Sequence, residues 1–169
     1  MDALDCIHTR RSIRKYEDKD VPDDLIKQIL NAAMTAPSAG NQQPWQFIVI
    51  KDRVVLGKIT EFHEYAQMCK DVHLAILVCA DTTSLRHEGM WEQDCSAATQ
   101  NILLSAHALG LGAVWCGVYP RDAKMNGFSK LLGIPEKIIP FALIPIGYPL
   151  QKSSKVDRYK KEKVHKDKW

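Results

Sequence analysis

Apolar and polar residues recur along the chain with two different periods, which predicts both helices and strands. Residues 22–36 repeat apolar side chains at spacings of one and four, as expected for one buried stripe of a helix. Pro22 suits the first turn of that helix, and Pro37 ends it because the residue before a proline is disfavoured in helical geometry. Residues 92–109 predict a longer helix, with a face of small residues, that Gly110 ends.

Shorter patterns complete the predicted set of elements. Runs rich in β-branched and aromatic residues predict strands at 45–50, 73–79, 113–118 and 138–146. Helical patterns cover residues 3–9, 53–68 and 121–132. Pro140 and Pro145 interrupt the last strand and predict an edge position or a bulged course. Helices and strands alternate with uneven connections, which predicts an α+β or α/β three-layer sandwich and leaves the strand order open.

Length and composition are those of one ordinary globular domain. The chain has 169 residues, of which 46% are hydrophobic and 25% charged. It contains no run near the ~18 apolar residues of a membrane span, and its first residues lack the apolar segment of a secretory signal. A cytoplasmic protein with no membrane partner is therefore expected. Its five cysteines are scattered without a C-x-x-C pair, which favours buried thiols over disulfides or a metal site.

The positive charge of the chain is concentrated in its last residues. Residues 151–169 carry eight Lys/Arg against three acids, which leaves 15 against 17 for residues 1–150, although the whole chain has a net charge of +3. Aromatic and apolar residues interleave these charges, as in a tail that packs on protein. The body offers no basic patch large enough for duplex binding, so no nucleic-acid partner is expected.

The segment R-R-S-I-R places three guanidinium groups and a hydroxyl within five residues, Arg10 to Arg14. Arginine binds phosphate through paired N–H donors, so this segment is a candidate phosphate site. A solvated basic turn is the alternative, and the segment taken alone favours that alternative.

The stretch TAPSAGNQQPW, residues 35–45, carries more polar chemistry than a simple connection needs. A proline near each end fixes its course, and a central glycine permits a positive φ. Between them Ser38, Asn41 and Gln43 supply uncharged donors and acceptors, which suit the edge of a neutral heterocycle. A loop whose polar groups satisfy its own backbone is an equally good interpretation of the loop alone.

Other patterns argue against several enzyme classes. The glycines of residues 110–117 are spaced wrongly for a dinucleotide fingerprint, and they follow a helix instead of preceding one. His-Glu at 87–88 lacks the second histidine of a zinc protease, and no serine lies in a G-x-S-x-G elbow. Metal and nucleophilic hydrolase functions therefore have little support.

Five segments together resemble the nitroreductase family of flavin enzymes over essentially the whole chain. They are RRSIRKY at 10–16, the run from VPDDL to QFIVI at 21–50, QNILLSAHALGLGAVWCGVYP at 100–120, IPIGYP at 144–149, and Asp157-Arg158-Tyr159. The most specific part is the ordered pair of R-R-S-x-R and P-S-x-G-N-x-Q-P-W. The resemblance implies an α+β three-layer α/β/α sandwich with a mostly antiparallel sheet. It also implies an interlocked homodimer with FMN at the interface.

The resemblance also assigns cofactor-binding residues. Those expected to hold the phosphate and ribityl chain are Arg10, Arg11, Ser12, Arg14 and, from the tail, Arg158. Those expected to meet the isoalloxazine are Pro37, Ser38, Asn41 and Gln43, with Ser38 crossing from the other subunit. Those expected to line the strand end that faces the ring are Trp115, Cys116 and Gly117. Residues 1–150 would form the FMN-binding domain, and residues 151–169 would be its tail, packed on the partner subunit.

The implied activity is an FMN-dependent oxidoreductase that uses NADH or NADPH to reduce nitroaromatics, quinones or similar small acceptors by a ping-pong mechanism. The flavin carries the chemistry, so no catalytic acid or base is assigned. A non-catalytic flavin-binding or redox-sensing protein is the alternative, and a tail-driven nucleic-acid or membrane binder is a third interpretation.

Overall fold

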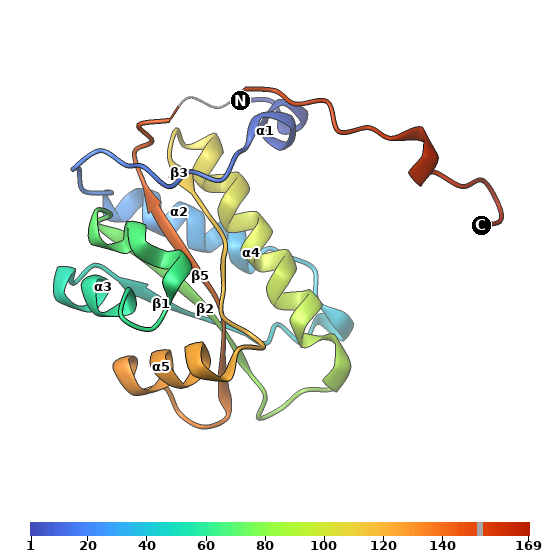
Figure 1. Cartoon of the computed structure of the whole chain (residues 1–169). Coiled ribbons are helices and arrows are strands. Elements are labelled where there is room, and N and C mark those ends of the chain that lie inside the picture. The colour runs from blue at the N-terminus through green and yellow to red at the C-terminus, as the bar shows by residue number, and fades with distance from the viewer. Residues whose placement is uncertain (152–153) are drawn as a thin grey trace.

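A five-stranded sheet lies between two layers of helices in the computed structural model, which describes residues 1–151 and 154–169 (Figure 1). The strands run in the order β1 (Trp45–Ile50), β2 (Leu74–Asp81), β5 (Ile138–Gly147) and β3 (Gly112–Ala113), and β4 (Cys116–Gly117) also pairs with β5. Every pair of these strands is antiparallel. The predicted α+β sandwich with a mostly antiparallel sheet is confirmed.

Four helices begin and end within two residues of their predicted bounds, whereas the predicted helical region 53–68 is a helix over Arg53–Ile59 followed by a 3₁₀ segment over Glu64–Lys70. The helices are α1 (Ala3–Thr9), α2 (Asp23–Met34), α3 (Arg53–Ile59), α4 (Trp91–Ala108) and α5 (Asp122–Leu132). Single 3₁₀ segments are η1 (Ala39–Asn41), η2 (Glu64–Lys70), η3 (Glu88–Met90) and η4 (Lys161–Lys163). Asp2 caps α1 by accepting from the backbone N–H groups of Leu4 and Asp5, and Gly133 ends α5 with a φ of 64°.

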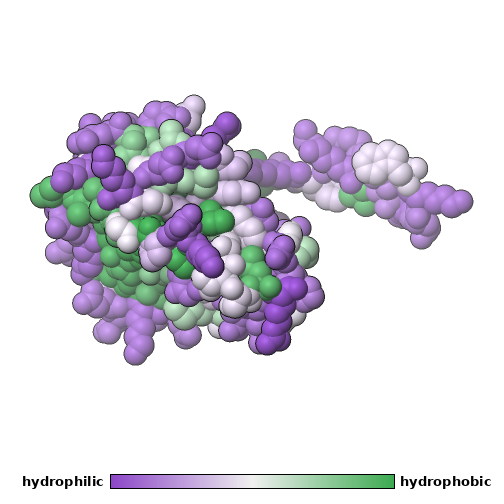
Figure 2. Space-filling view, turned by 90° about the horizontal axis from the view of Figure 1, so that it is seen from below, coloured by the Kyte–Doolittle hydropathy of each residue, from purple (hydrophilic) through white to green (hydrophobic). Residues whose placement is uncertain are grey.

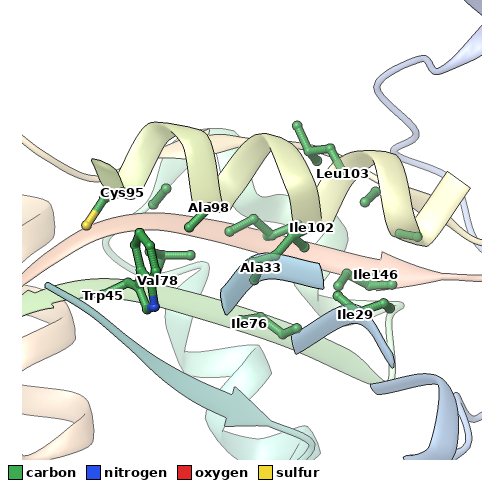
Figure 3. Packing of buried hydrophobic residues seen from close by; sticks show 14 of the residues in the cluster. Ile29, Ala33, Trp45, Ile76, Val78, Cys95, Ala98, Ile102, Leu103 and Ile146 are labelled. Carbon is green, nitrogen blue, oxygen red and sulfur yellow. The ribbon is translucent and has the colours of Figure 1, made fainter. Parts of the chain in front are cut away.

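Strand β2 divides the core into two layers because its side chains alternate between the two faces of the sheet. Leu74, Ile76 and Val78 face a cluster that contains the buried residues of α2 and α4. Figure 3 shows Ile29 and Ala33 of α2 with Ala98 and Ile102 of α4 in this cluster. The alternate residues of β2 face a second cluster formed with α3, η2 and α5. Both faces of the sheet are therefore covered, which makes β2 buried along almost its whole length.

Strand β5 lies in the centre of the sheet, so the predicted edge position is wrong, while the predicted bulge is confirmed. The register between β2 and β5 shifts at Val78/Cys79, where Pro140 pairs with Cys79. On the other side, the common register of β3 and β4 places Val114 opposite Pro145. Proline has no N–H to donate there, which explains why the predicted strand 113–118 is divided into two short pieces.

The last residues extend away from the sandwich. Residues 154–169 are exposed along their whole length, and Figures 1 and 2 show much of this segment standing clear of the body, with hydrophilic side chains predominating. Its apolar side chains Val156, Tyr159, Val164 and Trp169 are exposed as well. Residues 152 and 153 of the predicted tail lie outside the described residues. Within the described part of the chain, none of the helices has the length and hydrophobicity needed to cross a membrane.

Candidate functional site

Three arginines from the two ends of the chain meet in one pocket. Arg10, Arg11 and Arg158 line a cavity of about 420 Å³, here called the arginine pocket, together with Ile7, His8, residues 155–157 and Tyr159. The Arg11 Nη1 atom donates to the backbone carbonyls of His8 and Arg10, at 3.0 and 2.6 Å. Arg11 Nη2 is buried and has no hydrogen-bond partner among the described residues.

The positive charges of the arginine pocket repel one another. Burial lowers the pKa of Arg10, and the nearby charges of Arg11 and Arg158 lower it further. The same Arg10 and Arg11 charges, after burial itself, lower the pKa of His107, whose ring nitrogen lies 2.8 Å from the Thr9 hydroxyl. A cluster of cations with an unpaired buried donor fits an anionic ligand, since an anion would both accept from Arg11 and reduce the repulsion.

A second pocket lies beside β4. Arg14, Trp115, Cys116 and Gly117 line a cavity of about 420 Å³, here called the strand pocket, whose other lining residues are Glu64, Tyr65, Gln67, Met68 and Val114. Gly117 is exposed, and a Cβ atom at this position would meet no other atom within 4 Å. The backbone at Gly117 is therefore open to close approach by a flat ligand.

One extended segment joins the two pockets. Ser12 forms a parallel bridge with Ala113, and the Ile13 N–H donates to the Ala113 carbonyl at 3.0 Å. A side chain at Gly112 would collide with Ile13, because its Cβ atom would lie 2.7 Å from the nearest Ile13 atom. Residues 10–14 consequently pass along β3, with the exposed Ser12 between the two pockets.

The buried side chains of Cys116 and His63 form hydrogen bonds with backbone groups at the strand pocket. Burial raises the pKa of the Cys116 thiol to about 11, and Cys116 donates to the Tyr65 carbonyl at 3.5 Å. The fully buried His63 places Nε2 3.1 Å from the Gly117 carbonyl, which makes Nε2 the protonated nitrogen. Burial, followed by the charge of Lys124, lowers the pKa of His63. A neutral imidazole thus holds the carbonyl of the residue that is open to the pocket.

Lys124 brings a second positive charge to this side of the molecule. Its side chain is only 11% exposed, and its Nζ atom lies 3.3 Å from Glu64 and 4.9 Å from the centre of the Tyr65 ring. Arg14 and Lys124 both oppose the burial effect on the pKa of Cys116. Two cations therefore act on the strand pocket.

The polar residues of the loop 37–43, here called the amide loop, are bonded to one another. Ser38 Oγ accepts from the Gln43 N–H at 3.0 Å, and Gln43 Nε2 donates to Asn41 Oδ1 at 3.1 Å. Part of the polar chemistry of the loop thus satisfies the loop itself, as the plainer of the two sequence interpretations predicts. Pro37, Asn41 and Gln43 are nevertheless exposed. The buried Trp45 anchors the end of the loop in the core (Figure 3).

Within one chain the amide loop lies far from the arginine pocket. The loop is bonded to Asp94 in the first turn of α4, whereas Thr9, the residue before the arginine segment, contacts His107 in the last turn of the same helix (Figure 1). Asp94 and His107 are 13 positions apart, which corresponds to about 20 Å along the helix axis. The structure brings the predicted arginines together and brings Arg14 to the strand end, but it leaves the amide loop at the other end of the helix.

Comparison with known proteins assigns the fold to a family. The family model described as "Nitroreductase family" matches residues 7–87 and 65–148 of this chain. The chain belongs to the nitroreductase family. The predicted resemblance is confirmed.

Individual relatives agree with this assignment. A protein of Methanothermobacter thermautotrophicus named "Putative NADH dehydrogenase/NAD(P)H nitroreductase" is 52% identical over 169 residues, which are 100% of this chain and 88% of the relative. A solved structure from Clostridium difficile R20291, an "FMN-dependent Nitroreductase", is 30% identical, with a TM-score of 0.90 over 98% of this chain and 99% of that chain. A Desulfovibrio desulfuricans structure, described as a "putative nitroreductase in complex with fmn", is 33% identical, with a TM-score of 0.84 over 100% of this chain and 98% of that chain.

Several residues of the candidate site have no signal in the sequence pattern. His63, Lys124 and Asp94 lie outside the quoted motifs, and Gln42 stands among similar polar residues. Only the fold reveals that His63 contacts β4 and that Asp94 contacts the amide loop. An acid in the first turn of a helix is common, so the sequence does not distinguish Asp94 from Glu92 beside it, and only the structure shows that Asp94 is buried.

Proposed function

We propose that this chain is an FMN-dependent oxidoreductase that uses NADH or NADPH to reduce nitroaromatics, quinones or similar small acceptors in a ping-pong cycle. Membership of the nitroreductase family and relatives that carry FMN in their names support the cofactor. FMN supplies the redox chemistry when it is bound, accepting hydride and returning electrons to an acceptor. The protein supplies position and charge.

The observation that carries this proposal is the buried Arg11 Nη2 atom, which has no hydrogen-bond partner in residues 1–151 and 154–169, in a pocket of three arginines. A phosphate would accept from it, and the segment that begins there leads directly to the strand pocket. Four residues of extended chain span at most about 14 Å. A ligand with a phosphate at one end and a ring at the other would lie along this segment, with Ser12 beside its middle and Arg14 beside its ring.

The positive charges around the strand pocket suit a ring that gains negative charge. Arg14 and Lys124 would both stabilise negative charge that develops on a ligand bound there. Gly117 would allow the ring to approach the backbone, and His63 would hold that backbone in place. These residues bind and orient, and none of them needs to exchange a proton.

The lining of the strand pocket supports a homodimer. Among the described residues of one chain, none of the amide loop lines that pocket, and a second copy would bring its own Ser38, Asn41 and Gln43 there. The exposed apolar side chains of the tail, such as Tyr159 and Trp169, support packing of residues 154–169 on that second copy. Each of the two sites would then lie between subunits.

The absorption spectrum of the purified protein tests the cofactor and the activity. The bands of oxidised flavin are expected, and they should bleach when NADH or NADPH is added without oxygen. Subsequent menadione or nitrofurazone should restore them. Colour without bleaching would favour the alternative, a flavin-binding protein with no catalytic role, and absence of colour would refute the proposal.

Two variants test where the cofactor lies. Arg14→Ala should weaken FMN binding, because a hydrogen bond to a charged group contributes about 1.5–3 kcal/mol. Truncation after Leu150 should lower FMN content and shift the protein from dimer to monomer in sedimentation. If the truncated protein kept its FMN and its dimer, the assigned role of the tail would be wrong.

A further inference from the structure

A buried carboxylate holds the amide loop against the start of α4. Asp94 is 4% exposed and lies in the first turn of an 18-residue helix, where the helix dipole favours a negative charge. Its Oδ1 atom accepts from the Ala39 N–H at 2.9 Å, and its Oδ2 atom accepts from Gln42 Nε2 at 2.7 Å. Both contacts lie within the loop, and among the described residues no cation pairs with Asp94 within salt-bridge distance.

Gln42 extends this contact to a third segment of the chain. Its Oε1 atom accepts from the backbone N–H groups of Arg86 and His87, both at 3.1 Å, and its Nε2 atom also donates to the His87 carbonyl at 3.3 Å. The amide can do this in one orientation only, because Nε2 must face the acceptor-only carboxylate of Asp94. Asp94 therefore decides which way Gln42 points, and Gln42 ties residues 86–87 to the loop.

The backbone of the amide loop adopts an unfavourable conformation that contacts with other segments must stabilise. Gly40, Asn41 and Gln43 have φ values of 53°, 53° and 47°, a left-handed region that residues with a Cβ adopt at a cost in energy. Gly40 packs against His87 so closely that a Cβ atom there would lie 2.5 Å from the ring. The contacts through Asp94 and Gln42 stabilise this conformation against relaxation of the backbone.

We propose that Asp94 and Gln42 are positioning residues that set the geometry of the flavin-facing side chains of the amide loop. This inference rests on the proposed function, since it assumes that Ser38, Asn41 and Gln43 meet the cofactor. Hydrogen bonds connect these three residues: the Gln43 N–H donates to the Ser38 hydroxyl, and the Gln43 side chain donates to the Asn41 side chain. A displacement of the loop at Gln42 is therefore transmitted to all three donors and acceptors at once.

A reciprocal exchange of the two polar groups tests the proposal. Asp94→Asn places an NH₂ donor against a donor from Gln42, or else leaves the Ala39 N–H unsatisfied. Gln42→Glu brings two carboxylates together. In the double variant the donor of residue 94 faces the acceptor of residue 42, the Ala39 N–H keeps its acceptor, and the carboxylate at 42 still accepts from Arg86 and His87. Only the 3.3 Å hydrogen bond from residue 42 to the His87 carbonyl is lost.

The measurements are the Kd of FMN, the reduction potential of bound FMN and the thermal midpoint of each holoenzyme. Each single variant should weaken FMN binding about 10- to 100-fold, as expected for one hydrogen bond to a charged group, and should shift the potential. The double variant should bind FMN more tightly than either single variant, while the lost hydrogen bond to the His87 carbonyl keeps its Kd above that of the wild type. Glu92→Gln removes a charge from the same helix turn without touching the loop, and serves as the control that should change neither the Kd of FMN nor the reduction potential.

Two outcomes would overturn the inference. The first is a lowered thermal midpoint in both single variants with unchanged FMN affinity and potential, which would limit Asp94 to a structural role. The second is a double variant no better than the single ones, because the paired exchange would then not be the cause. Wild-type protein that bound no FMN would refute the proposed function itself, whereas recovery of the thermal midpoint in the double variant would still show that the two side chains are paired.

Discussion

Replacement of Arg11 by lysine separates recognition of the phosphate from recognition of the flavin ring. The Nη1 atom of Arg11 is already used by the carbonyls of His8 and Arg10, and the buried Nη2 atom lacks an acceptor among the described residues. A lysine ammonium keeps the charge, but it lacks the planar guanidinium group that can donate hydrogen bonds to the two carbonyls and to a ligand at the same time. Arg11→Lys should therefore remove about one charge-assisted hydrogen bond, or about 1.5–3 kcal/mol. This corresponds to a Kd for FMN that rises about 10- to 100-fold.

Riboflavin provides the comparison, because it has the same ring and ribityl chain without the phosphate. Flavin-free wild-type and Arg11→Lys proteins are titrated with each ligand, and quenching of flavin fluorescence gives the two Kd values. The variant should lose affinity for FMN and retain its affinity for riboflavin. Arg121→Lys is the matched control, since Arg121 is exposed and lines neither pocket.

Two results would refute this reasoning. If FMN and riboflavin weakened by the same factor, Arg11 would act on the shape of the site and not on a phosphate. If FMN binding were unchanged, the anion would lie elsewhere, and the arginine pocket would lose its assigned role.

Further predictions concern stability. Gly127→Ala should lower the free energy of unfolding by about 1–3 kcal/mol in a denaturant titration, because the new Cβ atom would lie 2.4 Å from the Phe62 ring; Gly57→Ala, with open space in α3, should raise it by about 0.5–1 kcal/mol. If both substitutions changed the free energy of unfolding by the same amount, the collision of the new Cβ atom with Phe62 would not be the cause. Two histidines should give opposite pH dependence. Hydrogen bonds to two carboxylates raise the pKa of His73, so its stabilisation is complete below about pH 6.5 and is lost as the pH rises through the raised pKa. Burial lowers the pKa of His63, so stability falls as the pH drops below about 6.5. Replacing either histidine by glutamine should remove its own pH dependence from thermal melts measured between pH 5 and 8, and an unchanged profile would refute the corresponding assignment.

Much of the fold follows from local chemistry in the sequence. Apolar periodicity places α2 and α4 within two residues of their observed ends, since the pattern reports directly which face of a helix is buried. Helices α1 and α5 lie where the sequence predicts them, and their caps at Asp2 and Gly133 depend on neighbouring residues alone. The motifs also select the correct family, because the order and spacing of R-R-S-x-R and P-S-x-G-N-x-Q-P-W are read along the chain.

What only the tertiary structure decides is which distant groups meet. A proline shows that one backbone hydrogen bond of its strand is missing, but it does not show whether that strand lies at the edge or in the centre of the sheet. The central position of β5 is known only because the structure places strands on both sides of it. The contacts of Asp94 with Ala39 and of His63 with Gly117 join residues more than fifty positions apart. Such contacts arise when independently formed elements pack, and no local period records them. The same reason applies to the amide loop and the arginine pocket, whose separation along α4 is set by packing and not by their spacing in sequence.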